Sequence, residues 1–570
     1  MQLRWKVKQA DKEKVNALQQ ELKVHPVLCE LLVQRGIETY EAAKKFFRPE
    51  LNELHDPFLM KDMDKAVNRI AEAISRNEKI LIYGDYDVDG TTAVSTVYLF
   101  FKEFYPNIEY YIPHRYTEGY GISFQGIDYA AENNFPLIIA LDCGIKSNDK
   151  VDYANEKKID FIICDHHNPG DDLPDGQAGI PKAVAVLDPK RNDCPYPYKE
   201  LSGCGIGFKL IQAFAQQNGM DAETCYRYLD LVCVSIGADI VPITGENRIL
   251  AHYGLKKVNE NPLPGLKKLM EASGKQGQMD ITNVVFILAP RINAAGRMDD
   301  AKHAVLLLVS ADVDLSSADN AEQLNKFNTD RKDLDKNITI HALDMLLNDA
   351  NLANRKSTVV FHPEWHKGVL GIVASRLTDT YYRPTIVLTQ SDGKVTGSAR
   401  SVKNFDLYEA VYECRDLLIQ FGGHKYAAGL TMLPENVDAF RNRFDEVVSA
   451  RITDEQLVPE LEIDAEIELE DINPRFYGII QQMAPYGPEN MQPVFVTRGV
   501  KDSNWSKVVK EEHIKFSVKK NNSPVIDGIG FRLAEKFSLV KNGTFDIAYN
   551  INENVWNDRV SLQMMVKDIN

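Results

Sequence analysis

The chain has 570 residues, of which 44% are hydrophobic and 26% are charged, as in ordinary globular proteins and unlike disordered or fibrous ones. This length predicts several domains. The formal net charge of −16 excludes a uniformly basic surface, although it is compatible with a local basic channel.

The sequence shows no sign of export or of membrane insertion. The first residues, MQLRWKVKQADKEK, lack the apolar segment of a secretory signal, and no uncharged apolar run is long enough to cross a bilayer. The eight cysteines form no Cys-x-x-Cys pair, and several lie inside apolar runs, as buried free thiols do in a reducing compartment. We therefore expect a cytoplasmic protein without membrane contact.

Residues 1–60 predict short amphipathic helices, which we interpret as a helical cap ahead of the first strand. From residue 61 onward, amphipathic helical segments alternate with short apolar strands such as KILIYGD, PLIIALD and IDFIICD. This alternation predicts βαβ units and a mostly parallel sheet. Ligands of such sheets bind beyond the carboxyl ends of the strands.

The most informative stretch is KILIYGDYDVDGTT, residues 79–92. Asp85, Asp87 and Asp89 follow a buried strand at alternate positions, so on an extended segment their carboxylates would point the same way. A divalent cation would relieve their mutual repulsion, because hard cations prefer carboxylate oxygens. An acidic helix cap and an EF-hand calcium loop are the alternatives. Against calcium, Thr96 stands where that loop needs a glutamate, and a strand precedes the loop.

Metal-ligand side chains also follow the next strands. LIIALD ends with Asp142, FIICDHH ends with Asp165, His166 and His167, and the apolar segment CYRYLDLVCVSIGADIVP, interpreted as one helix, presents Asp239 near its end. A single such aspartate is more often a helix cap or a solvent-facing residue. Several in succession instead predict a shared rim of oxygen and nitrogen ligands.

Taken together, these residues predict a centre of two metal ions that hydrolyses a phosphate ester. The predicted set is Asp85, Asp87, Asp89, Asp142, His166 and Asp239. Because it contains one imidazole and no thiolate, Mn²⁺ or Mg²⁺ is a better fit than Zn²⁺.

Two further segments follow before the second α/β region of the chain. APRINAAGRM places Arg291 and Arg297 in what we interpret as a small-residue turn that could bind a phosphate. Residues 313–350 contain no proline or glycine and predict a long, exposed helix that connects two lobes rather than a core element.

The second half begins with another α/β pattern. Ser398 and Arg400 lie two apart on a predicted strand and would share one face, which suits an anion, while His424 follows paired glycines that indicate either close approach to a ligand or a tight turn. Beyond residue 455, short alternating segments predict an all-β module of five or six strands, of the oligonucleotide-binding (OB) type. Its aromatic residues either stack on bases or fill the barrel core; they are Trp505, Phe516, Phe531 and Trp556.

The order of motifs DYDVDG, LDCG, DHH and SIGADIVP resembles that of the DHH phosphoesterase superfamily. PHRYTEGYG, APRINAAGRM, WHKGVLGIVASRL, GSARS and FGGHKYAAGL are similar to further signatures of one of its families, the RecJ exonucleases, and the likeness covers essentially the whole chain. It implies a DHH domain at 61–312 after the cap at 1–60, a linking helix at 313–350, a DHHA1 substrate-binding domain at 351–454 and an OB-like domain at 455–570.

The resemblance also implies an activity and roles for residues. The expected activity is Mn²⁺- or Mg²⁺-dependent degradation of single-stranded DNA from its 5′ end to 5′-mononucleotides, in DNA repair and recombination. Asp87 and Asp89 would bind different ions, Asp142 would bridge them, and His166 and Asp239 would complete the second ion. Asp85 would orient the cluster and His167 would face the scissile phosphate. Substrate contacts are expected from Arg115, Arg291, Arg297, Ser398, Arg400 and His424.

Expected partners are single-stranded DNA and, among proteins, a single-strand-binding protein or a helicase, with the chain itself a monomer. The sequence departs from the family pattern at Asp188, where Asn is usual, and at 489–491, where Glu-Asn-Met replaces Gly-Asn-Pro. A phosphodiesterase for cyclic dinucleotides or very short oligonucleotides, a pyrophosphatase and a non-enzymatic replisome scaffold are the alternatives within the superfamily. The C-terminal β module argues against the small-substrate enzymes, and the intact ligand positions argue against the scaffold.

Overall fold

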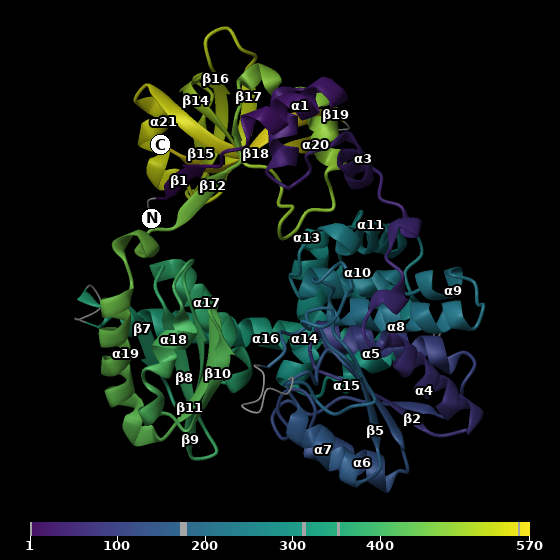
Figure 1. The fold of residues 1–570 in the computed structure, drawn as a ribbon. Coiled ribbons are helices and arrows are strands. Elements are labelled where there is room, and N and C mark those ends of the chain that lie inside the picture. Colours follow the sequence, from purple (N-terminus) through teal and green to yellow (C-terminus); the bar gives the residue numbers. More distant parts are fainter. Residues whose placement is uncertain (1–2, 171–178, 311–314, 350–353, 557–558) are drawn as a thin grey trace. The chain divides into compact units, whose positions relative to one another are not determined.

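The computed structural model describes residues 3–170, 179–310, 315–349, 354–556 and 559–570. The contacts divide the chain into a larger unit, residues 7–325 with 463–570, and a smaller unit, residues 326–462 with the start of the chain (Figure 1). Across the described residues, none of the helices has the length and the apolar character that crossing a bilayer requires.

The larger unit contains a five-stranded sheet in which every pair of neighbouring strands is parallel. Its strands lie in the order β3-β2-β4-β5-β6 and span β2 Ile80–Gly84, β3 Ile108–Tyr111, β4 Leu137–Leu141, β5 Asp160–Cys164 and β6 Ala185–Leu187. The predicted parallel sheet is thereby confirmed. Because the strand order reverses between β2 and β4, their carboxyl ends form the edge where such sheets bind ligands.

Helices cover both faces of this sheet, and alternate residues of each strand enter different cores. Ile82 and Ile139 belong to the core that includes residues of α4 (Met63–Ser75), α5 (Val88–Lys102) and α8 (Gly203–Gln217). Leu81 and Ile138 belong to the core on the other face, with α6 (Phe124–Glu132) and α7 (Asn148–Glu156). Burial on both faces explains why these strands are continuous apolar runs.

A helical region follows the sheet. It comprises α9 Glu223–Tyr226, α10 Leu229–Ala238, α11 Gly245–Glu260, α12 Pro264–Ser273, α13 Ile281–Asn283, the π-helix Val284–Leu288, α14 Ala289–Met298 and α15 Lys302–Leu308. The segment predicted as one helix before Asp239 is therefore two, α9 and α10. The predicted turn at APRINAAGRM is wrong, because α14 is a helix that continues directly from the π-helix Val284–Leu288.

The C-terminal part of the larger unit is a β module of seven strands, more than the five or six predicted. The strand order is β13-β14-β18-β19-β17-β16-β15, and an additional β14–β16 pairing closes the sheet on itself. The strands are β13 Ala465–Glu466, β14 Phe495–Asp502, β15 Lys507–Val509, β16 His513–Lys519, β17 Ile526–Gly530, β18 Thr544–Trp556 and β19 Arg559–Ile569, with helices α20 Pro474–Gln482 and α21 Phe537–Lys541.

The N-terminal helices belong to this β module and not to the first sheet. Strand β1 (Arg4–Val7) pairs with β12 (Glu460–Ile463), and helices α1 (Lys12–Leu22), α2 (Pro26–Val33) and α3 (Tyr40–Phe47) follow β1. Buried residues of these helices share one core with the barrel strands, Leu18 and Leu28 packing in the cluster that contains Phe495. The short helices predicted for residues 1–60 are present as α1–α3, and their apolar faces are buried by a segment more than 400 residues away.

The smaller unit has a mixed sheet in the order β10-β11-β9-β8-β7, parallel only between β7 and β8. The strands are β7 Thr358–Phe361, β8 Thr385–Ser391, β9 Lys394–Arg400, β10 Gln420–His424 and β11 Ala427–Met432. Ile386 packs in a core with residues of α18 (Leu407–Tyr412) and α19 (Val437–Arg451), and its neighbour Val387 packs in another with α17 (Leu370–Tyr381).

The predicted long helix is present as α16, Leu315–Leu347, 33 residues long. It is not only an exposed connector, however. Ile338, Ala342 and Leu346 are buried in the smaller unit's core with α17. The sparse apolar positions of this segment concealed that role, because a narrow stripe at helical spacing is enough to bury one face.

Candidate metal centre

The turn after β2 places three aspartates in different local structures. Asp85 still follows the strand, and its Oδ1 accepts a hydrogen bond from the Gly121 amide at 3.2 Å. Asp87 is the N-cap of α5 and accepts from the Gly90 amide at 3.0 Å. Asp89 lies in the first helical turn, so the predicted extended alternation of the three residues is wrong. Gly90 is required here because a Cβ would lie 2.4 Å from the Asp85 carbonyl oxygen.

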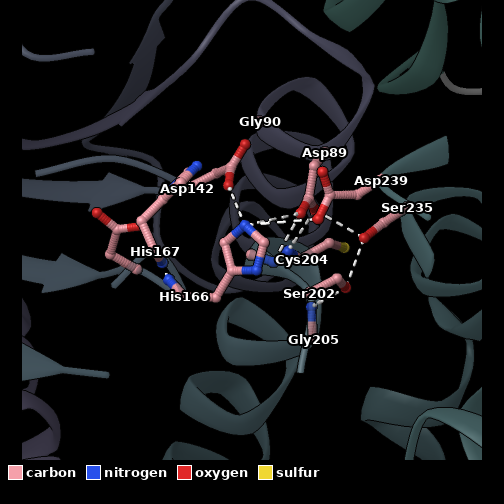
Figure 2. Close-up of polar contacts among 12 residues, drawn as sticks. Asp89, Gly90, Asp142, His166, His167, Ser202, Cys204, Gly205, Ser235 and Asp239 are labelled. Carbon is pink, nitrogen blue, oxygen red and sulfur yellow. Dashed lines mark hydrogen bonds and ion pairs between the residues drawn. The ribbon is translucent and has the colours of Figure 1, made fainter. Parts of the chain in front are cut away.

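Asp89 is held by the start of another helix (Figure 2). Its two carboxylate oxygens accept hydrogen bonds from the backbone amides of Gly203 at 2.7 Å and Cys204 at 2.8 Å, at the N-terminus of α8. The Ser235 hydroxyl donates to Asp89 Oδ1 at 2.7 Å. An anion at a helix N-terminus is favoured by the free amides and the helix dipole. The orientation of Asp89 is therefore fixed by its surroundings.

Three carboxylates converge on one imidazole (Figure 2). The His166 Nε2 atom lies 3.2 Å from Asp142 Oδ1, 3.6 Å from Asp239 Oδ2 and 3.8 Å from Asp89 Oδ2. Asp142 directly follows β4, His166 lies two residues beyond the end of β5, and Asp239 caps the C-terminus of α10. The structure therefore brings these predicted ligand side chains together, although Asp239 reaches them from a helix end.

His167 belongs to a second polar chain beside this cluster. Its Nδ1 atom lies 2.7 Å from Asp165 Oδ1, and its Nε2 atom lies 3.1 Å from the Tyr120 hydroxyl. Burial would lower the pKa of His167, but the hydrogen bond and the charge of Asp165 raise it to about 9. Burial likewise opposes the ionisation of Asp165, yet the contact with His167 lowers the pKa of that carboxyl to about 2. His167 thus carries a proton at neutral pH.

The remaining electrostatics fit a site that binds cations. Burial first, and then the charge of Asp89, raise the pKa of Asp142 well above its ordinary range, and the same causes raise the pKa of Asp239 to about 8. Burial and the charge of Asp87 also raise the pKa of Asp85. Burial lowers the pKa of His166 and keeps its imidazole neutral, the form that binds metals.

The donor atoms fit divalent ions. Asp142 Oδ1 and Asp85 Oδ2 are buried and have no hydrogen-bond partner among the described residues. Two overlapping groups of ligand atoms lie within 4.8 Å of one another, Asp89, His166 and Asp239 in one and Asp142, His166 and His167 in the other. Oxygen-rich sites of this kind suit Mn²⁺ and Mg²⁺. Neither group includes Asp85 or Asp87, whose roles toward a metal stay predictions.

We expect divalent metal to stabilise the protein more strongly as pH rises. The folded metal-free protein binds the Asp239 proton more tightly than the unfolded chain does, so this stabilisation is lost as pH rises through about 8. A bound cation replaces the lost protons. The midpoint of thermal unfolding with and without Mn²⁺, measured at mildly acidic and mildly alkaline pH, tests this. An equal Mn²⁺ increment at both pH values would contradict it.

The predicted arginines of the larger unit have different surroundings. The Arg115 guanidinium carbon lies 4.8 Å from the Tyr86 ring centroid, and the Arg115 charge offsets a small part of the rise in the pKa of Asp85 that burial causes. Arg297 also acts on Tyr86, so both arginines lie near the aspartate turn. Arg291 is buried and donates to Asn325 Oδ1 at 3.0 Å and to the Ile287 carbonyl at 2.6 Å.

The predicted residues of the smaller unit form their own cluster. Arg400 donates to the Ser398 hydroxyl at 3.0 Å, which confirms that the two side chains share one face of β9. His424 pairs with Ala427, which pairs with Arg400, so the three lie in a row across the sheet. His424 is the last residue of strand β10 and pairs with Ala427 across the two-residue turn that leads to β11.

The N-terminus of α17 adjoins this pair: a Cβ on Gly371 would lie 2.7 Å from Arg400 Nη2 and 3.1 Å from Ser398 Oγ. No described carboxylate neutralises Arg400, and burial lowers its pKa. A cation, a hydroxyl and a helix N-terminus are the donors that bind a phosphate.

The aromatic candidates of the β module divide into two kinds. Phe516 is fully buried in the barrel core, whereas Trp505 is 79% exposed and Phe531 55% exposed. The side chain of Trp556 lies outside the described residues. Trp505 and Phe531 therefore remain available for stacking, and Phe516 does not.

The two departures from the family pattern occupy structural positions. Asp188 is fully buried, and its Oδ1 accepts from the Lys190 amide at 2.7 Å. Of the second departure, Glu489 has φ +60°, a conformation that favours glycine, and Met491 is 63% exposed. Asn490 between them fits the family pattern; it accepts from Arg35 Nε at 3.0 Å and donates to the Met483 and Pro485 carbonyls at 2.9 Å.

Sequence reasoning missed the groups that hold the ligands. Ser235 and the Gly203 and Cys204 amides fix Asp89, and Tyr120 contacts His167. The one usable signal was Ser202 before two closely spaced glycines, which is typical of a helix N-cap. Tyr120 and Ser235 had no signal because their contacts are made across the fold.

Comparisons with known proteins agree with this architecture. The DHH family N-terminal domain matches residues 79–236, the DHHA1 domain matches 354–450 and the RecJ OB domain matches 463–568. A parallel sheet that carries an Asp-His rim, followed by these two further domains, defines a protein of the DHH class. The predicted fold class is confirmed.

Relatives of known name identify the family. The single-stranded-DNA-specific exonuclease RecJ of Bacillus subtilis (strain 168) is 37% identical over 99% of this chain and 70% of that protein. RecJ of Dickeya dadantii (strain 3937) is 30% identical over 95% of this chain and 96% of that protein. The chain belongs to the RecJ family.

Solved structures give the same result. The crystal structure of RecJ in complex with Mn²⁺ from Thermus thermophilus has a TM-score of 0.84 and 26% sequence identity, over 100% of this chain and 79% of that chain. A second structure, of exonuclease RecJ bound to manganese, has a TM-score of 0.60 and 31% identity, over 71% of this chain and 97% of that chain.

Proposed function

We propose that this chain is a metal-dependent exonuclease that hydrolyses single-stranded DNA from the 5′ end and releases 5′-mononucleotides. The observation that carries the proposal is the convergence of Asp89, Asp142 and Asp239 on His166 in a chain that is 37% identical to a single-stranded-DNA-specific exonuclease. Membership of the RecJ family separates this function from the alternatives of small-substrate phosphodiesterase, pyrophosphatase and scaffold.

The metal would be Mn²⁺ or Mg²⁺, the ions of the related Thermus thermophilus structures. Asp89, Asp142, His166 and Asp239 would hold two ions together with Asp87. Ions bound there lower the pKa of water and stabilise negative charge on a phosphate. Asp142 would contribute to both ions, as the family resemblance implies, and its Oδ1 atom is buried without a hydrogen-bond partner among the described residues.

The chain's own residues would orient the phosphate. His167 carries a proton, and its Nε2 atom contacts a tyrosine hydroxyl, so it can donate a hydrogen bond to a phosphate oxygen instead. Asp85 would fix the positions of Arg115 and the aspartate turn. Arg297 would contact the DNA strand beside Tyr86. Arg291 would act by fixing α14 rather than by touching DNA, given its buried contacts.

Digestion of labelled DNA tests the function directly. We expect 5′-labelled single strands to lose the label as mononucleotide first when Mn²⁺ is present, with no reaction in chelator and little on blunt duplex. A 3′-labelled strand should shorten gradually before its label is released. Release of the 3′ label first, or equal digestion of duplex, would overturn the proposed polarity or substrate. Single-strand-binding protein or helicase partners and a monomeric state remain predictions from the resemblance.

Arg400 is expected to recognise the terminal 5′-phosphate. Arg400→Ala should lower kcat/KM for 5′-phosphorylated strands by roughly 10–100-fold, the range of a lost charge-assisted hydrogen-bond pair. It should leave 5′-hydroxyl strands nearly unaffected, because they lack the group that the guanidinium binds. Steady-state kinetics on matched oligonucleotides with either end measure the ratio. Arg443→Ala, an exposed arginine of α19, is the control. An equal loss of kcat/KM on 5′-phosphorylated and 5′-hydroxyl strands would contradict this role of Arg400.

A further inference from the structure

Ile240 is an apolar side chain placed beside the predicted metal ligands. It directly follows Asp239, whose Oδ2 lies 3.6 Å from His166 Nε2, and it is 64% exposed. The next residue, Val241, turns back into the core and is 7% exposed. The chain therefore presents a large hydrophobic group to solvent directly beside a cluster of polar ligands.

The backbone at Ile240 is also unfavourable for its residue type. Ile240 has φ +59°, and it is the only β-branched residue with positive φ among those the structure describes. It occupies the position after the C-cap of α10, where glycine is the usual residue because it has no Cβ to clash. A β-branched residue in the left-handed region is an outlier, and such outliers gather at functional sites.

We propose that Ile240 packs against the nucleoside of the phosphodiester that is bound at the metal centre, and so positions the strand for cleavage. This inference rests on the proposed nuclease function. Its support is the combination of place in the chain, exposure and backbone conformation: the Ile240 Cα is about 3.8 Å from that of Asp239, and the side chain is 64% exposed on a residue with φ +59°. The sugar and base are joined covalently to the phosphate, so a bound phosphodiester brings them to the same place.

The contact offered by Ile240 is apolar and lacks hydrogen-bonding groups. It can therefore support the face of any sugar or base and does not select a sequence. A glycine would remove the backbone strain but would also remove this surface. The residue thus exchanges local stability for a substrate contact, and the two effects can be measured separately.

The test uses the full chain and two variants at this position. Ile240→Gly should unfold at the same temperature as the wild type or up to about 2 °C higher, because strain is relieved. Its kcat/KM for a single-stranded oligonucleotide should fall about tenfold, the effect of losing a few apolar carbons in a contact. Ile240→Val should retain most of the activity. The Mn²⁺ increment in thermal stability should equal that of the wild type.

A second substrate isolates the contact. The wild type should be less active on an oligonucleotide with an abasic 5′-terminal nucleotide than on the intact one. Ile240→Gly should show little difference between the two oligonucleotides, as in a double-mutant cycle, because it already lacks the contact. Lys23→Gly is the matched control, because Lys23 is an exposed helix C-cap with φ +53° on α1 and adjoins no predicted ligand. It should relieve strain without altering activity.

The results separate the inference from the proposed function. If Ile240→Gly loses the same factor on intact and abasic strands, or loses nothing on either, the nucleoside contact is overturned. If Ile240→Gly unfolds at a lower temperature than the wild type, and Ile240→Val loses as much activity as Ile240→Gly, the residue is structural and the inference also fails. If the wild type itself does not digest single strands, the proposed function fails first.

Discussion

Replacing Asp142 is expected to lower the rate of DNA hydrolysis by at least about a thousand-fold, because metal-ion catalysis supplies several kcal/mol of transition-state stabilisation. Asp142 Oδ1 lies 3.2 Å from His166 Nε2, is buried and has no hydrogen-bond partner among the described residues, so no other side chain replaces it. Asp142→Ala and Asp142→Asn should both show the loss.

The asparagine variant protects the test against misfolding. Asp142 has φ +59°, a conformation that Asn tolerates well and Ala does not. Asp149→Ala serves as the control, since Asp149 is an exposed residue of α7. Initial rates and metal content by elemental analysis are the measurements. Wild-type rate and metal content in Asp142→Asn would contradict the assignment of Asp142 as a shared ligand.

Removing residues 463–570, which deletes the β module, is expected to unfold the N-terminal helices as well. Leu18, Leu28 and Leu31 of α1 and α2 are buried in the same core as Phe495 and Ile547 of the barrel. Exposing each such side chain costs about 1.5–3 kcal/mol. Hydrogen exchange of residues 12–47 should therefore lose its protection in the truncated protein, while the parallel sheet keeps its own.

A second truncation makes this expectation sharper. A chain without residues 1–47 and without 463–570 loses both halves of the shared core and should be more soluble than the chain that lacks only 463–570. Unchanged protection of residues 12–47 after the single truncation would show that the helices fold independently. Loss of activity after the single truncation cannot be assigned to lost DNA contacts alone.

The ligand rim was predictable because two strong local signals coincide. Apolar runs mark β2, β4 and β5, and parallel strands bring their carboxyl ends to one edge. Asp142 and His166 could therefore be placed together without coordinates. Asp239 was grouped with this edge from its place at the end of an apolar helix, which alone does not say which neighbour it faces; the family resemblance then gave it a role at the second ion.

Other features depend on contacts that leave no local trace. Asp89 is held by hydrogen bonds from the start of α8, more than 100 residues later in the chain. The sequence around Asp89 contains no pattern that predicts this contact. The segment APRINAAGRM has the composition of a turn, but it is helical because tertiary packing overrides weak propensity. Gly296 illustrates this packing, since a Cβ there would lie 3.0 Å from the Tyr86 carbonyl oxygen.

The core shared by α1–α3 and the C-terminal barrel has a consequence for synthesis. These helices leave the ribosome before β14 to β19, which follow more than 400 residues later. At ordinary translation rates the wait is roughly half a minute, during which the apolar faces of the helices have no native partner. The two α/β domains can fold in that interval. The nascent N-terminus must meanwhile stay soluble or be shielded, so chaperones are expected to act on about the first 50 residues rather than on the nuclease core.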